Sequence, residues 1–318
     1  MTLIILEIGV RVWGYSERYI TDPIYSSFEG SQDIPYIHKP NLVEAHARGL
    51  AVINTDSLGL RAKTSGAVYG PKQRHEYRIA IVGDSVTFGE GVPRTGDTYA
   101  QVLEDILNQK QNSLSVKVFN FGATAYSVKQ MAATLKYRME NVEPDLVVLA
   151  IIPHDLDLSR TPGVVIDGYH VEEKVLPFLS PDSPIRLFLR FVRLTYVVRD
   201  LYLFIGVKPL DIYQQLASGE IPDSYRFIQQ FRDTATEKSL RYLIVLLPSW
   251  KEGTWWNHIT KEFEQEKITY LDVSSLRNEF TWEHYRASRF DRHPSPAVHR
   301  RIGESLAAYV QHQPEFPQ

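Results

Sequence analysis

Cysteine is absent from the sequence, and this absence excludes several kinds of site at once. Without a thiol the chain has no disulfide, no thiolate metal site and no cysteine nucleophile. A basic excess is also absent, since 35 lysines and arginines stand against 38 aspartates and glutamates, for a net charge of −3. A chain of this charge is poorly suited to neutralise a phosphate backbone, so we expect no nucleic-acid partner.

The apolar run near the N-terminus is short. It extends from Leu3 to Trp13, whereas a helix that spans a bilayer needs about 20 apolar residues. Glu7 and Arg11 lie within it at the i,i+4 spacing of a helix surface pair. Two interpretations remain open: a packed N-terminal helix, or the C-terminal end of a signal anchor. The remaining composition, 43% apolar and 23% charged, is typical of a globular protein.

The sequence shows no phosphate-binding loop and no metal-binding motif. Gly89 and Gly91 follow a serine, but the lysine of a Walker motif is missing. The ten histidines are scattered and do not pair with carboxylates at ligand spacing outside the candidate site described below. We therefore expect no cofactor and no metal.

From residue 78 onward, short β-branched runs alternate with helical periodicity. This pattern predicts a doubly wound α/β fold, in which helices cover both faces of a parallel sheet. We expect about five strands, at 78–82, 116–121, 145–152, 243–247 and 268–273. The third is apolar after its first residue and should be central.

Helix signals separate these strands. Apolar residues recur at three- and four-residue steps over 98–111. Ser127 and Gln130 form a capping box for a second helix. The last helix should begin with Ser295 as N-cap and Pro296 at its first position.

Two segments interrupt this alternation. Residues 1–75 form an N-terminal extension, and the domain over 76–318 carries an insertion at about 156–235. Aromatic and basic side chains recur in the insertion and predict either helices over the active-site edge or simple packing against the main domain. They are Phe188, Arg190, Phe191, Arg193, Tyr196, Arg199, Tyr202 and Phe204.

Polar residues follow the strands at the edge where parallel sheets place their chemistry. The first strand leads into Gly83-Asp84-Ser85, and Asp291-Arg292-His293 lies just before the last helix. A serine needs a histidine base held by a carboxylate, so we predict Ser85 as nucleophile, His293 as base and Asp291 as its partner. His299 is the weaker candidate base because it falls inside the last helix. The N–H groups of Ser85 and Gly122, at the end of the second strand, are candidate oxyanion donors.

These blocks resemble the SGNH or GDSL-like hydrolase family over roughly residues 78–155 and 240–310. The matching residues are 81–89 with Gly91-Val92, Gly122, and 291–295 with His299. The resemblance implies a flavodoxin-like α/β/α sandwich that acts on esters. One block departs from it, because His154 stands before Asp155 where the family has asparagine. His154 either donates to the oxyanion in place of the asparagine amide or only packs and bonds to Asp155.

The segment 53–61 (INTDSLGLR) resembles a stretch that precedes the catalytic domain in a membrane-anchored, polysaccharide-associated branch. This resemblance implies a location in the cell envelope or periplasm and membrane association through the N-terminus.

We therefore expect a serine esterase that hydrolyses short acyl esters, O-acetyl above all, on a carbohydrate such as an acetylated polysaccharide. An acyltransferase that uses the same acyl-enzyme, and a catalytically weak glycan-binding protein, remain the alternatives. Four tryptophans are compatible either with sugar stacking or with the core: Trp250, Trp255, Trp256 and Trp282.

Overall fold

A computed structural model shows a five-stranded parallel sheet at the centre of the molecule, in the order β12-β11-β8-β6-β7. The structure describes residues 1–49, 51–109, 114–139, 141–159, 163–171, 180, 182–206, 212–251, 253–314 and 316. The strands are β6 (Glu76–Gly83), β7 (Ser115–Gly122), β8 (Leu146–Ile151), β11 (Arg241–Leu246) and β12 (Tyr270–Asp272). All five lie where the sequence predicts strands, and β8 is the central one.

The order of the strands explains where a site can form. Taken along the chain, β6, β7, β8, β11 and β12 have the flavodoxin-like order 2-1-3-4-5. The order reverses between β6 and β8, which opens a crevice beyond their carboxyl ends. Every residue of β6 and β8 is buried, as expected for strands covered on both faces.

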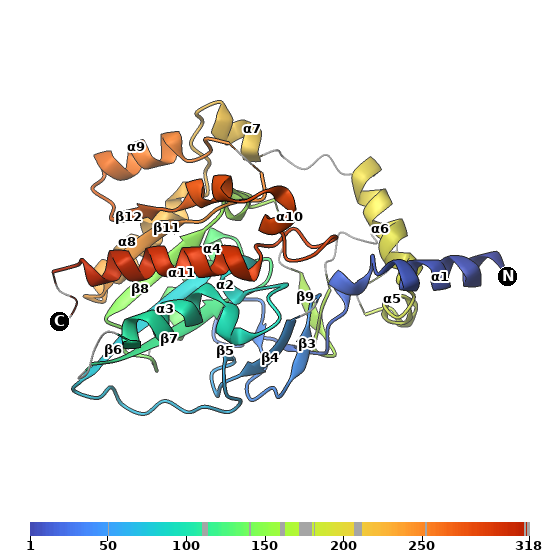
Figure 1. Cartoon of the computed structure of the whole chain (residues 1–318), viewed down its shortest axis with the longest axis horizontal. Helices are drawn as coiled ribbons and strands as arrows, with labels where there is room; N and C mark the ends of the chain where they lie inside the picture. Colours follow the sequence, from blue (N-terminus) through green and yellow to red (C-terminus); the bar gives the residue numbers. More distant parts are fainter. Residues whose placement is uncertain are drawn as a thin grey trace.

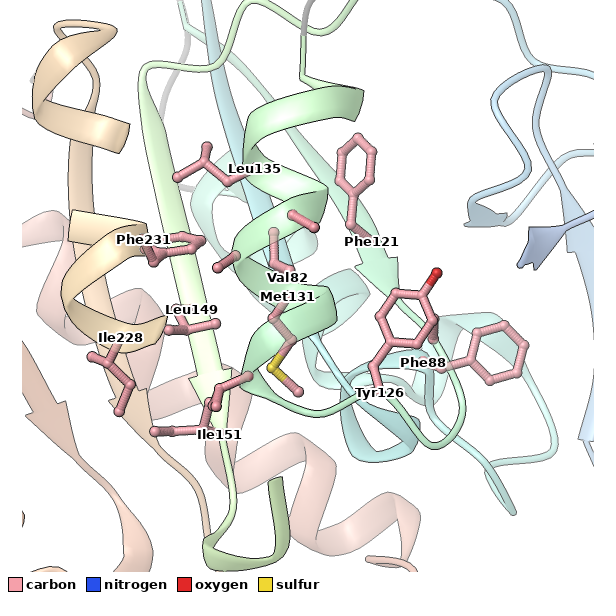
Figure 2. Packing of buried hydrophobic residues seen from close by; sticks show 14 of the residues in the cluster. Val82, Phe88, Phe121, Tyr126, Met131, Leu135, Leu149, Ile151, Ile228 and Phe231 are labelled. Carbon is pink, nitrogen blue, oxygen red and sulfur yellow. The ribbon is translucent and has the colours of Figure 1, made fainter. Parts of the chain in front are cut away.

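Helices cover both faces of the sheet and make a three-layered α/β/α sandwich (Figure 1). On one face lie α4 (Val128–Arg138), α8 (Tyr225–Glu237) and α9 (Asn257–Gln265), and on the other lie α3 (Tyr99–Gln109) and α11 (Pro296–Gln311). Figure 2 shows the first face, where Met131 and Phe231 pack against Val82 and Leu149 of the strands.

The sequence signals for the helix starts are found in the structure. Both halves of the Ser127–Gln130 capping box are formed. Ser295 is the N-cap of α11 and Pro296 follows it, but the Ser295 hydroxyl donates to the carbonyl of His284 at 2.6 Å and makes no cap hydrogen bond. The N-cap position was therefore correct, although its side chain ties α11 to the preceding loop.

In the described part of the N-terminal extension, helix α1 (Thr2–Trp13) and the short 3₁₀ helix η1 (Glu17–Tyr19) precede short antiparallel strands. The first two strands are β1 (Tyr25–Ser26) and β2 (Ile37–His38), and then β3 (Ala45–Ala47), β4 (Ala51–Thr55) and β5 (Arg61–Ala62) form a three-stranded sheet. Within the described ranges, no helix combines the length and the hydropathy that a membrane span requires.

The insertion follows η3 (Pro153–Leu156). It contains the hairpin β9 (Val164–Ile166)–β10 (Tyr169–Val171) and helices α5 (Pro184–Leu189), α6 (Arg193–Gly206) and α7 (Ile212–Ala217). Figure 1 shows α5 and α6 beside α1, at one end of the molecule.

Hydrogen bonds join the insertion to the N-terminal extension. Glu7 accepts the N–H groups of Arg193 and Leu194 at the start of α6, and Asp200 accepts the hydroxyls of Tyr15 and Tyr19. The aromatic and basic stripe of the insertion therefore contacts the N-terminal extension. The sequence offers two interpretations, helices over the active-site edge or packing against the main domain, and neither names the extension. The side chains of Tyr202 and Phe204 lie outside the described part.

Candidate active site

The nucleophile turn follows β6 directly. The strand ends at Gly83, and the short helix α2 (Ser85–Phe88) begins two residues later, with Asp84 as its N-cap. The Asp84 carboxylate accepts the N–H of Val86 at 2.8 Å. A Cβ at Gly83 would lie 1.9 Å from the Thr87 hydroxyl oxygen, so the tight turn requires glycine. This turn places Ser85 at the carboxyl edge of the sheet.

His293 connects the Ser85 hydroxyl to a carboxylate. Its Nε2 lies 2.9 Å from Ser85 Oγ, and its Nδ1 lies 2.6 Å from Asp291 Oδ1. Asp291 Oδ1 also accepts the His293 backbone N–H at 3.0 Å, which fixes the loop between α10 (Trp282–Tyr285) and α11. The structure brings together the three residues that the sequence predicted as nucleophile, base and carboxylate partner.

The charges around His293 favour its protonated form. Burial alone would lower the pKa of His293, but Asp291, Glu90 and Asp84 outweigh burial and raise this pKa to about 9. Burial raises the pKa of Asp291, but the His293 imidazole overcomes it and holds that pKa at about 2. A carboxylate–imidazolium pair is therefore the resting state at neutral pH.

Glu90 is a second carboxylate at the base, and it was not predicted from the sequence. Its Oε2 lies 3.3 Å from His293 Nε2 and 3.7 Å from an Arg48 guanidinium nitrogen, while Thr124 Oγ1 donates to Oε1. The side chain is only 2% exposed. Gly89 and Gly91 have φ of 85° and 73°, so left-handed glycines on both sides turn Glu90 toward the site. The signal for Glu90 was a carboxylate between two glycines five residues after the nucleophile.

The Ser85 hydroxyl has two acceptors within reach but only one proton. Asp84 Oδ2 lies 3.1 Å away and His293 Nε2 lies 2.9 Å away. When His293 is protonated, Nε2–H is a donor and the hydroxyl points to Asp84. When His293 is neutral, the hydroxyl donates to Nε2, which is the arrangement that activates a serine.

The structure does not support Gly122 as an oxyanion donor. Its N–H donates to Asn120 Oδ1 at 2.9 Å, and the residue does not line the cavity at Ser85. A Cβ at Gly122 would lie 2.1 Å from Phe88 N, so glycine here allows β7 to pack against α2. The glycine at the end of β7 therefore marks a close approach of two backbones and not an oxyanion donor.

Ala125 is better placed for the role predicted for Gly122. It lines the cavity with Ser85 and His293 and has a left-handed φ of 61°, which is uncommon for alanine. Its N–H has no acceptor among the described residues. The Ser85 N–H, in the first turn of α2, is likewise available because such groups have no intrahelical partner.

The cavity at Ser85 has a volume of about 520 Å³ and is lined by residues from many parts of the chain. Tyr19 and Arg48 come from the extension, His154 from η3, and Trp250 from the loop after β11. His154 thus reaches the site where the sequence predicted a third oxyanion donor. Of the four tryptophans, Trp256 is buried in the core, whereas Trp250 and Trp282 line cavities.

The extension also holds the nucleophile helix in place. Arg61 is buried and donates to the carbonyls of Phe88, Gly89 and Val92, at the C-terminal end of α2. Asp56 Oδ1 accepts two backbone N–H groups and shapes the turn before it. The segment 53–61, noted for its resemblance, therefore supports the active-site turn.

His299, the weaker candidate base, does not line the cavity at Ser85. It is fully buried, and its Nδ1 accepts the N–H of Tyr99 at 3.1 Å. Within the described residues, no group of three or more histidine, aspartate or glutamate side chains is arranged to hold a metal ion.

Comparisons with known proteins gave matches to solved structures only. No family model matches the sequence, and neither does any curated protein. A Clostridium thermocellum family 3 carbohydrate esterase is similar at a TM-score of 0.45 and 16% identity, over 74% of this chain and 96% of that one. A G-D-S-L family lipolytic protein from Veillonella parvula is similar at 0.43 and 13%, over 75% and 100%.

Proposed function

We propose that this protein is a serine esterase in which Ser85 is the nucleophile, His293 the general base and Asp291 the carboxylate that orients it. One observation carries the proposal: Ser85 Oγ, His293 and Asp291 form a continuous chain with links of 2.9 and 2.6 Å. The chain lies at the carboxyl edge of the sheet, on the wall of an open cavity.

The proposed reaction proceeds through an acyl-enzyme. Ser85 Oγ attacks the ester carbonyl carbon while its proton moves to His293 Nε2, and the carbonyl electrons move onto oxygen. The N–H groups of Ser85 and Ala125, with His154, are the candidate donors to this oxyanion. When the intermediate collapses, the alkoxide leaves with the proton from Nε2. Water then attacks the acyl group by the same route and restores Ser85.

We further propose a short acyl group, O-acetyl above all, on a carbohydrate. The aromatic wall formed by Trp250 is suited to a sugar ring, and the acyl group then enters toward Ser85. An acyltransferase would use the same intermediate and release the acyl group to a sugar hydroxyl. Product analysis separates the two, because only hydrolysis gives free acetate without an acylated acceptor.

Labelling by a fluorophosphonate tests the nucleophile. The probe should label the folded wild-type protein, and Ser85→Ala should abolish the labelling. Ser249→Ala is a matched control, because Ser249 lines the same cavity but pairs with Tyr213 and not with a histidine. Folded protein that resists the probe, or labelling that survives in Ser85→Ala, contradicts the proposal.

A further inference from the structure

The catalytic cavity lies between two other cavities and shares walls with both. The first flanking cavity, about 380 Å³ between the extension and the insertion, shares Tyr19 and Arg48 with it. The second flanking cavity, about 640 Å³ beside α10, shares Tyr15, Trp250, Phe290 and Arg292 with it. Because neighbouring cavities share walls, the three lie side by side with the nucleophile at the central one, and we call them together the track.

Positive charge is concentrated on the two flanks of this track. Six arginines line the first flanking cavity and four line the second, and among the described residues no carboxylate lines either one. The carboxylates are found at the centre, where Asp84, Glu90, Asp200 and Asp291 line the catalytic cavity. The whole chain has a net charge of −3. The arginines on the flanks are therefore gathered there by the fold, and an overall excess of basic residues does not explain them.

Two of the described acidic residues contact residues that line the first flanking cavity, and both are already engaged. Glu7 binds Arg11 and two backbone N–H groups, and Asp200 binds Arg199 and two tyrosine hydroxyls. Arg190, by contrast, packs its guanidinium 3.9 Å from the centre of the Tyr169 ring. Its Nε and Nη1 are buried and have no hydrogen-bond partner among the described residues. Buried donors of this kind are normally satisfied, which makes the Arg190 guanidinium a candidate to bind a ligand oxyanion.

The second flanking cavity combines arginines with indole rings. The Arg292 guanidinium lies 4.9 Å from the Trp250 ring centre, and that of Arg286 lies 5.7 Å from the Trp282 ring centre. Flat aromatic faces suit sugar rings, and guanidinium groups bind carboxylates through two parallel hydrogen bonds. A unit that is both a sugar and an anion fits this wall.

We propose that the substrate is an extended acidic glycan, in which uronate units occupy both flanking cavities while the acylated unit lies at Ser85. This inference rests on the proposed esterase function. Carboxylates surround Ser85, so the uncharged ester group, and not a sugar carboxylate, is the part of the acylated unit that lies beside the nucleophile. The flanking arginines bind the carboxylates on either side and set the register of the chain.

Matched substrates test the inference. The ratio to measure is kcat/KM for acetylated oligogalacturonate over kcat/KM for acetylated xylo-oligosaccharide of equal length, with p-nitrophenyl acetate as a reference. Arg190→Gln and Arg289→Gln each remove a charge from one flank, and each should lower this ratio roughly tenfold. Arg193→Gln repeats the test on the first flank if Arg190→Gln does not fold. Arg300→Gln, on the exposed side of α11, is the matched control and should leave the ratio unchanged.

The outcomes separate the two proposals. If folded wild-type protein hydrolyses no p-nitrophenyl acetate, the esterase function fails. If it does, but the ratio is near one or is unaffected by the flank variants, only the acidic-glycan inference fails. The ratio should also fall as sodium chloride is raised, since exposed charges are screened. Stronger competition by single-stranded DNA than by polygalacturonate would overturn the assignment to a glycan.

Discussion

At the scale of single residues, the site is defined by two carboxylates on opposite sides of one imidazole. Asp291 contacts Nδ1 of His293, as in any serine triad, while Glu90 faces Nε2, the nitrogen that must accept the serine proton. Both stabilise the imidazolium, and the pKa of His293 is about 9. At neutral pH the imidazole is therefore mostly protonated, and only its minor neutral form can accept the serine proton.

We predict that activity increases from pH 7 to about pH 9, because only the neutral imidazole accepts the serine proton. Below the pKa, kcat/KM should rise about tenfold per pH unit. Glu90→Gln removes one charge that stabilises the imidazolium and so lowers the pKa of His293. The rising limb of the pH profile should therefore shift to lower pH. A pH profile of kcat/KM for p-nitrophenyl acetate measures both.

The control for this variant is Glu104→Gln, a carboxylate on α3 that accepts the N–H of Val118 away from the site. It should leave the limb in place. A profile that is flat above pH 6, or that Glu90→Gln moves to higher pH, contradicts the role of Glu90.

His154 provides a second prediction at this scale. If it donates to the oxyanion, His154→Ala should lower kcat by roughly 10²–10³-fold. His154→Asn, which restores an amide donor, should keep most of the activity. Initial rates with p-nitrophenyl acetate for the two variants decide the matter, and an alanine variant as active as the wild type rules out the donor role.

The residues recovered from the sequence are those with a local pattern. Ser85 sits in a strand-to-helix turn, and Asp291 and His293 are two positions apart, so their chemistry is visible without coordinates. The two glycines beside Glu90 mark only a turn, and its role depends on contacts with Arg48 and Thr124 that only folding creates. Gly122 has a local pattern, but that pattern has two meanings. A glycine at a strand end can allow a close approach of two backbones as readily as it can supply an oxyanion donor.

At the scale of elements, the amino edge of the sheet is held by a buried ion cluster. Glu76 at the start of β6 contacts Arg78 at 2.9 Å and Lys117 of β7 at 2.7 Å, and the Glu76 and Arg78 side chains are almost fully buried. Burial raises the pKa of Glu76, but its pairing with Lys117 and Arg78 overcomes burial and holds this pKa at about 2.

We predict that Glu76→Gln lowers the free energy of unfolding by about 3 kcal/mol, because it leaves the Arg78 charge buried without its partner. The pKa of Glu76 is lower in the folded state than in the unfolded state. The contribution of Glu76 to stability is therefore full above about pH 4.5 and is lost as the pH falls toward 2. Urea unfolding at pH 7 and pH 3 measures it. A difference from the wild type that grows on acidification contradicts this account.

The comparison for Glu76 is an exposed pair. Glu279→Gln removes a partner of Arg301 at the surface, where both side chains are more than 40% exposed. This variant should change the midpoint of urea unfolding little. Activity should survive in both variants, because neither Glu76 nor Glu279 lines the catalytic cavity.

Sheet strands and core helices were predictable because each carries its own periodicity. The buried strands are continuous apolar runs, and the capping box before α4 marks its start by side chains alone. The short strands of the extension carry no comparable signal, because their pairing depends on turns such as that of Asp56. The sequence therefore predicted the layers of the domain but not the structure of residues 1–75.

At the scale of the whole molecule, the extension and the insertion meet over 180 residues apart in the chain and build one wall of the track. Asp200 is the joint, since both Tyr15 and Tyr19 donate to its Oδ2, at 2.7 and 2.6 Å. No local pattern predicts such a contact, so the sequence left open where the basic stripe of the insertion would pack.

We predict that Asp200→Ala loosens this wall without unfolding the domain. Two part-buried hydroxyls lose their acceptor, at a cost of about 1–3 kcal/mol each, and the loss should stay local. Amide hydrogen exchange should accelerate in residues 193–201 and remain unchanged in α3 and β8. Asp233→Ala, at an exposed pair on α8, is the control, and equal acceleration throughout the protein contradicts a local joint.

The central claim is that Ser85 is acylated during turnover. The most direct measurement is mass spectrometry of protein mixed with p-nitrophenyl acetate and quenched in acid, followed by peptide mapping. The account predicts one acetyl group on the peptide that contains Ser85, and none at that site in Ser85→Ala or, at pH 7, in His293→Ala. Turnover without an acetylated Ser85 at any time point, or an acetyl group carried by another residue that turns over, would contradict it.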